Sequence, residues 1–97
     1  MNSLYYCASY LLLLYQAHQR NYLTECAQMA KRASPNLQIC LVTQMRVIGI
    51  NCPEILGEHR KLFEELREQV ALKDYCQAAL DVIEGRRYSI ASLTLTR

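Results

Sequence analysis

The side chains most able to do chemistry in this chain are its five cysteines and two histidines. No two cysteines form a CxxC pair, and the histidines stand apart from them, so zinc-ligand spacing is absent. Cys7, Cys26, Cys40 and Cys76 lie among apolar residues in helical register, where a reduced thiol packs as a small hydrophobe. The odd number of cysteines and the lack of a secretion signal favour a reducing cytosol. The sequence therefore predicts no metal site, no cofactor and a cytoplasmic location.

Catalytic motifs are also missing. The sequence contains no GxGxxG, P-loop, GxSxG or HExxH pattern. Glu64, Glu65 and Glu68 fit the solvated face of a helix, while Arg86 and Arg87 suit the dipole at a helix end. We therefore expect a protein that is not an enzyme.

Composition narrows the fold and the partners. The 97 residues are 52% apolar and 21% charged, with three Gly and two Pro, which suits neither a disordered chain nor a loop-rich sandwich. Eleven basic and nine acidic residues leave a net charge of +2, too little for a nucleic-acid surface. We expect one all-α domain over residues 1–87 and a tail over residues 88–97 that has no helical repeat.

The first segment has an unusual charge pattern. Residues 1–19 contain no Lys, Arg, Asp or Glu, and only Ser9 interrupts the apolar run from Leu4 to Tyr15. A membrane span needs about 20 apolar residues, and a signal peptide needs a basic start and a small-residue cleavage site. The segment is thus predicted to be a buried helix, or a helix that packs its apolar face against a partner chain.

Apolar periodicity and helix-end residues predict about five helices. They are expected over residues 4–17, 22–33, 35–48, from about 51 past 72, and from about 74 to 85. Asn21, Ser34, Asn51 and Asp74 are the expected N-caps, with Glu54 completing a capping box. Pro35 and Gly49 bound the third helix, whose β-branched residues would also suit a buried strand. Gly57 is expected to kink or delay the fourth helix, and Gly85 to end the fifth.

Two stretches carry a repeat-like pattern. Tyr10, Leu13, Leu14 and Ala17 fit the first helix of a tetratricopeptide pair, and Cys26, Ala30 and Ala33 fit the small positions of the second. Residues 72–80 match the turn and second helix of another pair, with Ala78 at the close approach between helices. The chain therefore resembles a tetratricopeptide-like array of antiparallel helical hairpins.

The small size and the Tyr- and Leu-rich first helix resemble the co-chaperones that hold the needle subunit of type III secretion systems. That resemblance implies a cytosolic chaperone or adaptor that works with a second small helical partner. It also implies a concave face that cradles the amphipathic C-terminal helix of the needle subunit. Holding that helix would prevent premature assembly before export.

Surplus apolar surface points to a binding role as well. Five of the seven tyrosines fall in the first quarter of the chain, and Tyr is enriched at protein interfaces. If the first helices of successive pairs line a groove, the partner-binding residues are Tyr6, Tyr10, Leu13, Met45 and Arg46. The alternative is a structural subunit whose first helix pairs in a homodimer or larger bundle.

Overall fold

The computed structural model describes the backbone of residues 2–85 and the side chains of residues 14–85. Its helices are α1 (Asn2–Ala30), α2 (Pro35–Gly49), α3 (Pro53–Leu56), α4 (Arg60–Leu66) and α5 (Lys73–Ile83), with 3-10 turns at Gly57–His59 and Val70–Leu72. No strand occurs among these residues, so the all-α class is confirmed and the strand alternative for α2 is wrong. The predicted tail, residues 88–97, lies outside the described residues.

A single helix replaces the first two that the sequence predicts. Residues 4–17 and 22–33 were expected to form separate helices, yet α1 runs without interruption from Asn2 to Ala30. No Gly or Pro precedes Pro35, and an Asn inside a helix costs only about 0.7 kcal/mol relative to Ala. Asn21 therefore does not act as a cap, and the hairpin predicted within residues 7–40 does not form as expected.

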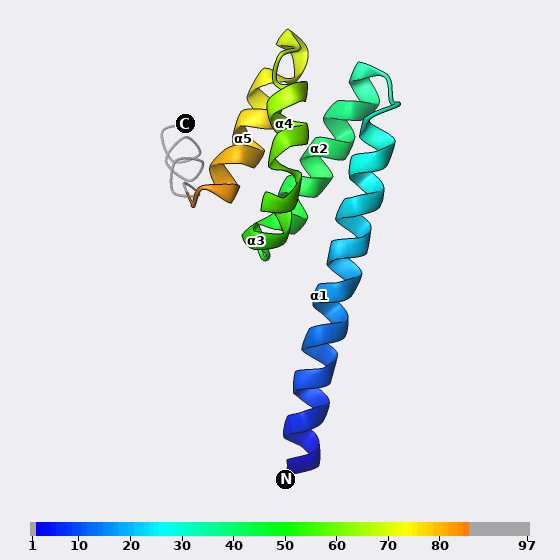
Figure 1. The fold of residues 1–97 in the computed structure, drawn as a ribbon, viewed down its shortest axis with the longest axis vertical. Coiled ribbons are helices and arrows are strands. Elements are labelled where there is room, and N and C mark those ends of the chain that lie inside the picture. Colours follow the sequence, from blue (N-terminus) through cyan, green and yellow to red (C-terminus); the bar gives the residue numbers. More distant parts are fainter. Residues whose placement is uncertain (1, 86–97) are drawn as a thin grey trace, which may run out of the picture.

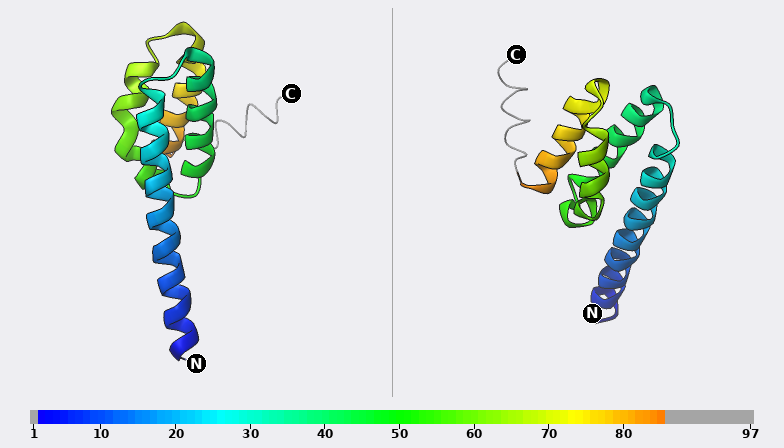
Figure 2. Two further views of the ribbon diagram at one scale, coloured as in Figure 1. Left: turned by 90° about the vertical axis from the view of Figure 1, so that its right-hand side faces the viewer. Right: turned by 45° about the horizontal axis from the view of Figure 1, so that its top comes forward.

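The helices form two antiparallel hairpins (Figures 1 and 2). The second half of α1 pairs with α2, and α4 pairs with α5, while α2 also packs against α5. The chain thus contains helical pairs as predicted, but the first pair begins about one helix later in the sequence. A consequence is that the first half of α1 has no intramolecular partner helix among the described residues.

The boundaries of the remaining helices confirm some predicted signals and correct others. Ser34 is the N-cap residue of α2 and Pro35 its first residue, and Gly85 follows α5 with a positive φ of 81°, as expected. The predicted fourth helix changes direction at Gly57, where a 3-10 turn separates α3 from α4. Asn51 and Asp74 are not N-caps. The N-cap residue of α3 is Cys52 and that of α5 is Leu72, and neither makes a side-chain capping hydrogen bond.

The core lies between the two hairpins. Its largest fully buried side chains come from all five α-helices and from the turn at Val70–Leu72, and are Phe63, Leu23, Met45, Leu56, Leu72, Val42, Val82 and Cys76. A buried polar bridge joins the hairpins at one end of this core. Gln38 Nε2 donates to the Ala30 carbonyl at 2.8 Å, and its Oε1 accepts from Gln69 Nε2 at 3.3 Å. This bridge satisfies a carbonyl in the last turn of α1, where intrahelical partners run out.

Ala79 is packed more deeply on α5 than Ala78. Ala79 is fully buried, whereas Ala78 is only partly buried, so burial does not favour Ala78, the position predicted for the close approach between helices. We expect Ala79→Leu to overpack the α5 interface and lower the free energy of unfolding by about 1–3 kcal/mol. Ala78→Leu should cost less, as measured by urea unfolding of the two variants. Equal losses would contradict this packing.

Two glycines give a matched test of the α2–α3 contact. A Cβ added at Gly49 would lie 2.8 Å from both Cβ and Cγ of Leu56, whereas one at Gly57 would lie 3.5 Å from Ile83. We expect Gly49→Ala to lower the free energy of unfolding by about 1–3 kcal/mol through overpacking. Gly57→Ala should be neutral or stabilise by up to about 1 kcal/mol. Urea unfolding of both variants checks the pair, and a stable Gly49→Ala protein would refute the close contact.

Candidate helix-docking surface

The first half of α1 extends beyond the rest of the molecule. In Figures 1 and 2 its ribbon runs past the ends of α2 and α3 with no other described element beside it. Along the described side chains, burial starts at Gln19 and continues at Leu23, Cys26, Ala27 and Ala30. We call residues 2–18 the projecting half of α1.

An ion pair holds α1 at the point where it leaves the hairpins. Arg20 lies 2.9 Å from the Glu58 carboxylate through one guanidinium nitrogen and 3.3 Å through another. Hydrogen bonding from Arg20 and the positive charge of its guanidinium lower the pKa of Glu58. Both side chains are about half exposed, so the pair fixes geometry more than it contributes stability.

Exposed apolar side chains follow one line along α1. Tyr15, Tyr22 and Met29 are seven residues apart and are 50%, 38% and 53% exposed. Because two helical turns span about seven residues, the three lie on nearly the same side of the helix. Leu37, at the start of α2, is 46% exposed and follows beyond Met29. We call the surface formed by Tyr15, Tyr22, Met29 and Leu37 the outer face.

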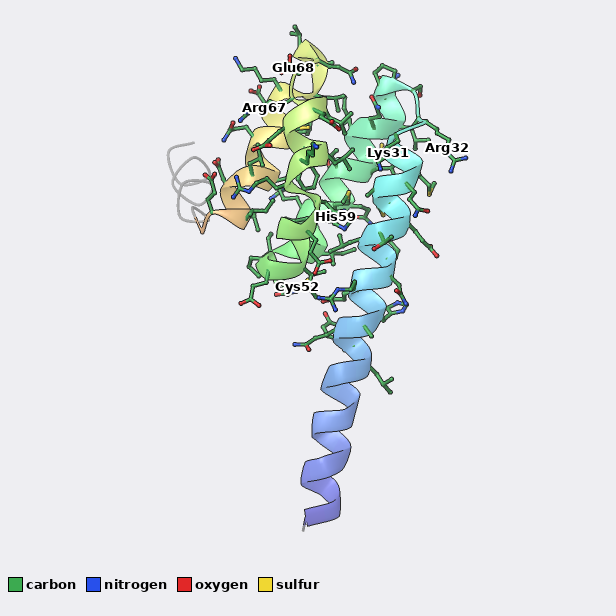
Figure 3. All side chains as sticks on the ribbon, viewed as in Figure 1. Lys31, Arg32, Cys52, His59, Arg67 and Glu68 are labelled. Atoms are coloured by element: carbon green, nitrogen blue, oxygen red, sulfur yellow. The ribbon has the colours of Figure 1, made fainter. Side chains whose placement is uncertain are left out.

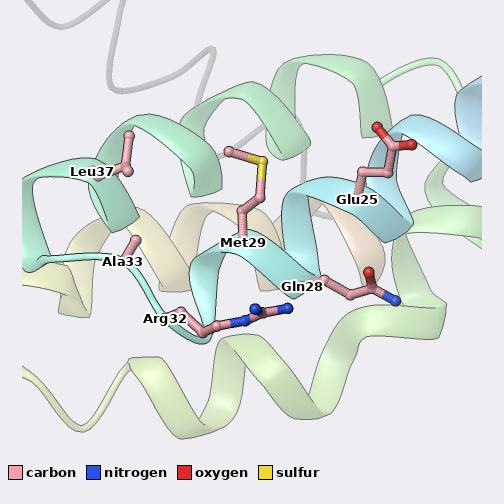
Figure 4. Close-up of a pocket in the computed structure, with 6 residues that line it drawn as sticks. All are labelled: Glu25, Gln28, Met29, Arg32, Ala33 and Leu37. Carbon is pink, nitrogen blue, oxygen red and sulfur yellow. The ribbon is translucent and has the colours of Figure 1, made fainter.

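A groove opens on the outer face where α1 meets α2. Its volume is about 450 Å³, and its lining residues are Glu25, Gln28, Met29, Arg32, Ala33 and Leu37. Figure 4 shows Met29 pointing into the space between the two helices, with Ala33 and Leu37 on one side of it. Glu25 and Arg32 place one charge of each sign along the α1 edge. The groove therefore has an apolar centre and a charged rim, which is the usual composition of a protein interface.

A second cleft, between α1 and α4, has a different character. Lys31, Lys61 and Glu65 line it together with Glu58 and His59. His59 lies between the first hairpin and α4 (Figure 3), and its Nε2 is buried without a hydrogen-bond partner among the described residues. Burial lowers the pKa of His59, Glu58 raises it, and Lys31 lowers it. This cleft is too charged to receive an apolar helix, so the outer face is the stronger candidate.

The five residues predicted to bind a partner do not form one surface. Met45 is fully buried in the core, so its assignment as a ligand-facing residue is corrected. Arg46 is partly buried on α2. Tyr6, Tyr10 and Leu13 belong to the projecting half of α1, and their side chains lie outside the described residues.

The outer face was missed because of the predicted break at Asn21. With a break there, Tyr15 and Tyr22 belong to different helices. The seven-residue intervals from Tyr15 to Tyr22 and from Tyr22 to Met29 then place no common surface on one helix. The signal was available in the sequence, since Tyr15, Tyr22 and Met29 recur at a constant interval. An uninterrupted helix makes that interval a continuous surface.

The thiols are free at all four described cysteines. Cys26 and Cys76 are buried, in agreement with the predicted packing role, and burial raises the pKa of Cys76 to about 11. Cys40 is exposed, so its predicted place in the core is wrong. Cys7 lies outside the described side chains. Within the described part of the chain, no group of three or more His, Cys, Asp and Glu residues could hold a metal ion.

Comparison with known proteins identifies no relative. No family model matches the chain, and no curated protein or solved structure matches it. None of the described helices is long and apolar enough to cross a membrane.

Burial of His59 predicts a pH-dependent stability. Above the ordinary pKa of 6.5 both folded and unfolded chains carry a neutral imidazole. As the pH falls below that value, His59 binds a proton in the unfolded chain but stays neutral in the folded chain. The free energy of unfolding therefore declines until the pH falls below the lowered pKa of His59 in the folded chain. We expect His59→Gln to lose less stability than the wild type between about pH 7 and about pH 5, measured by urea unfolding.

The control for this experiment is Lys73→Gln. Lys73 is exposed on α5, outside both the cleft and the outer face, so this variant should follow the wild-type decline. A His59→Gln protein whose pH profile also follows the wild type would show that the buried imidazole does not cause the effect.

Proposed function

We propose that this chain is a helix-binding adaptor of the chaperone type, which holds a small helical partner on its outer face. One observation carries the proposal: exposed apolar side chains at seven-residue spacing lead along α1 into a groove between α1 and α2. A ligand helix presents anchors every three, four and seven residues, which matches this spacing.

The side-chain types suit the same role. Tyr22 offers a rigid ring with a polar tip, and Met29 offers a flexible apolar chain that fills irregular space. Glu25 and Arg32 at the rim can pair with polar residues that flank the apolar stripe of a ligand helix. A surface of this kind holds helices of moderate sequence variety.

The position of the outer face adds to the argument. In stacked helical hairpins the outermost unit needs a polar outer surface for solubility. Here the first hairpin exposes Tyr22, Met29 and Leu37, and the projecting half adds Leu14 and Tyr15. Soluble monomers rarely expose an apolar patch larger than a few hundred Å². We therefore infer that another helix covers this surface in the working protein.

The proposal extends to type III secretion through the resemblance of the sequence to needle-subunit co-chaperones. The ligand would then be the amphipathic helix of the needle subunit, held in the cytoplasm with a second small helical protein. Covering that helix until export would prevent premature assembly. Loss of the ligand from the outer face at the export apparatus would release the subunit.

Two tyrosines of similar exposure test the proposal. Tyr22 on the outer face is 38% exposed and Tyr75 on α5 is 44% exposed, so they are matched in chemistry and accessibility. We expect Tyr22→Glu to weaken partner binding by about 1–2 kcal/mol or more, because it introduces a charge into an apolar contact. Tyr75→Glu should bind as the wild type does, in pull-downs of the tagged chain from its native host.

Site-specific photo-crosslinking gives the identity of the ligand. A benzophenone side chain at position 22 should crosslink to an amphipathic helical segment of a different small protein, and the same group at position 75 should not. Needle-subunit peptides among the products support the secretion role. The proposal fails if both positions give the same products, or if position 22 gives none from another protein.

A further inference from the structure

The helical register of the outer face can be continued along the whole of α1. From Leu4 to Met29, steps of four and three residues alternate along the helix. This is the spacing of a heptad repeat, and it covers almost four heptads. Its positions are Leu4, Ala8, Leu11, Tyr15, His18, Tyr22, Glu25 and Met29. Every member with a described side chain, from Tyr15 to Met29, is exposed. A pattern of this length is typical of a helix that pairs with another helix along its whole length.

Only half of α1 has a partner within the chain. The helix has 29 residues, or about 43 Å at 1.5 Å per residue, and the hairpins cover only the part that follows residue 18. The projecting half, residues 2–18, is thus longer than the covered part, residues 19–30, and it includes the midpoint of α1 at Gln16. The projecting half carries no formal charge, so burying it against apolar side chains leaves no charged group unpaired.

We propose that, when no foreign helix is bound, the outer face is occupied by a second copy of this chain, with the two α1 helices antiparallel about a two-fold axis near Gln16. The projecting half of each copy then lies on the outer face of the other, beside the groove at Met29 and Leu37. The inference rests on the proposed function in taking the outer face as a helix-binding surface. It identifies a ligand for that surface as an uncharged, Tyr- and Leu-rich helix.

Charge decides between the two possible orientations. A parallel pair would place Glu25 against Glu25 of the other copy, and like charges in such positions repel. The antiparallel pair removes this repulsion. It places Leu4 opposite Met29 and Leu11 opposite Tyr22 of the other copy, and Tyr15 near His18. Glu25 then lies beside Ala8 of the other copy, close enough to the edge of the helix pair for its carboxylate to reach water.

The shape of the molecule also favours this arrangement. In the antiparallel pair the two sets of hairpins lie at opposite ends of the paired helices, so they do not compete for space. The same patch is used on both copies, as a closed two-fold interface requires. Each copy then covers the apolar surface that the other leaves exposed.

Sedimentation equilibrium of the full chain tests for the dimer. We expect the wild type and Tyr75→Glu to have twice the 11.2 kDa chain mass and Tyr22→Glu to dissociate, with a dissociation constant raised about tenfold or more. Met29→Glu, at a more exposed position, replaces Tyr22→Glu if that variant loses helicity by circular dichroism. A monomeric wild type, or a dimer unchanged by both outer-face substitutions, overturns the proposal.

Photo-crosslinking tests the orientation. Chains with a benzophenone side chain in place of Met29 are mixed with ¹⁵N-labelled wild-type chains, irradiated and digested with trypsin. We expect the labelled crosslinked peptide to be residues 1–20, attached near Leu4. Attachment to the labelled peptide that contains Met29 indicates a parallel pair and contradicts the proposal.

The two proposals can fail separately. A monomeric chain whose position 22 still crosslinks to a foreign helix refutes the dimer and leaves the adaptor function standing. A dimer with the expected crosslink, but with no foreign helix at position 22 in the host, supports the dimer and refutes the adaptor function.

Discussion

The continuity of α1 through residues 16–21 is the constraint on which the rest of the structure depends. Because no Gly or Pro interrupts this stretch, the apolar first segment cannot fold back onto the hairpins and is carried away from them. Small side chains at Ala27 and Ala30 let the second half of α1 lie close to its neighbours, and the Arg20–Glu58 ion pair fixes the point of departure. The projecting half and the outer face both follow from this one uninterrupted helix.

The two sides of α1 have different chemical roles. Toward α4 it faces a cleft lined by Lys31, Lys61 and Glu65, where the partly buried His59 is expected to make stability depend on pH. On the other side it presents Tyr22 and Met29, beside a groove with an apolar centre. A partner helix on the outer face would leave the charged cleft open. Binding and pH-dependent stability can therefore be altered separately by substitution.

Much of the fold could be predicted from the sequence, because its signals are local. Backbone properties of single residues explain three of these features. They are the start of α2 at Pro35, the break between α3 and α4 at Gly57, and the end of α5 before Gly85. The break expected at Asn21 did not occur, since a residue that can cap a helix can also lie within one at small cost. That single error shifted the helical pairing and assigned Met45 to a groove, when it packs in the core.

The candidate site was less predictable because it depends on which helix faces remain uncovered. The abundance of Tyr near the start of the chain predicted a surplus of apolar surface, and the two of these tyrosines with described side chains, Tyr15 and Tyr22, are exposed. The outer face itself could be located only when the pairing of α1 with α2 was known, since that pairing leaves Tyr22, Met29 and Leu37 exposed. The same reasoning explains Ala79, whose burial depends on the exact rotation of α5 against its neighbours.

Amide hydrogen exchange along α1 tests most directly whether another helix covers its exposed half. An isolated helix as short as the projecting half is marginally stable in water, so its amides should exchange rapidly when nothing is bound. We expect protection of residues 2–18 to rise with protein concentration or with an added ligand helix, while protection of α5 stays constant. Protection of residues 2–18 that matches α5 at every concentration, with and without ligand, would contradict it.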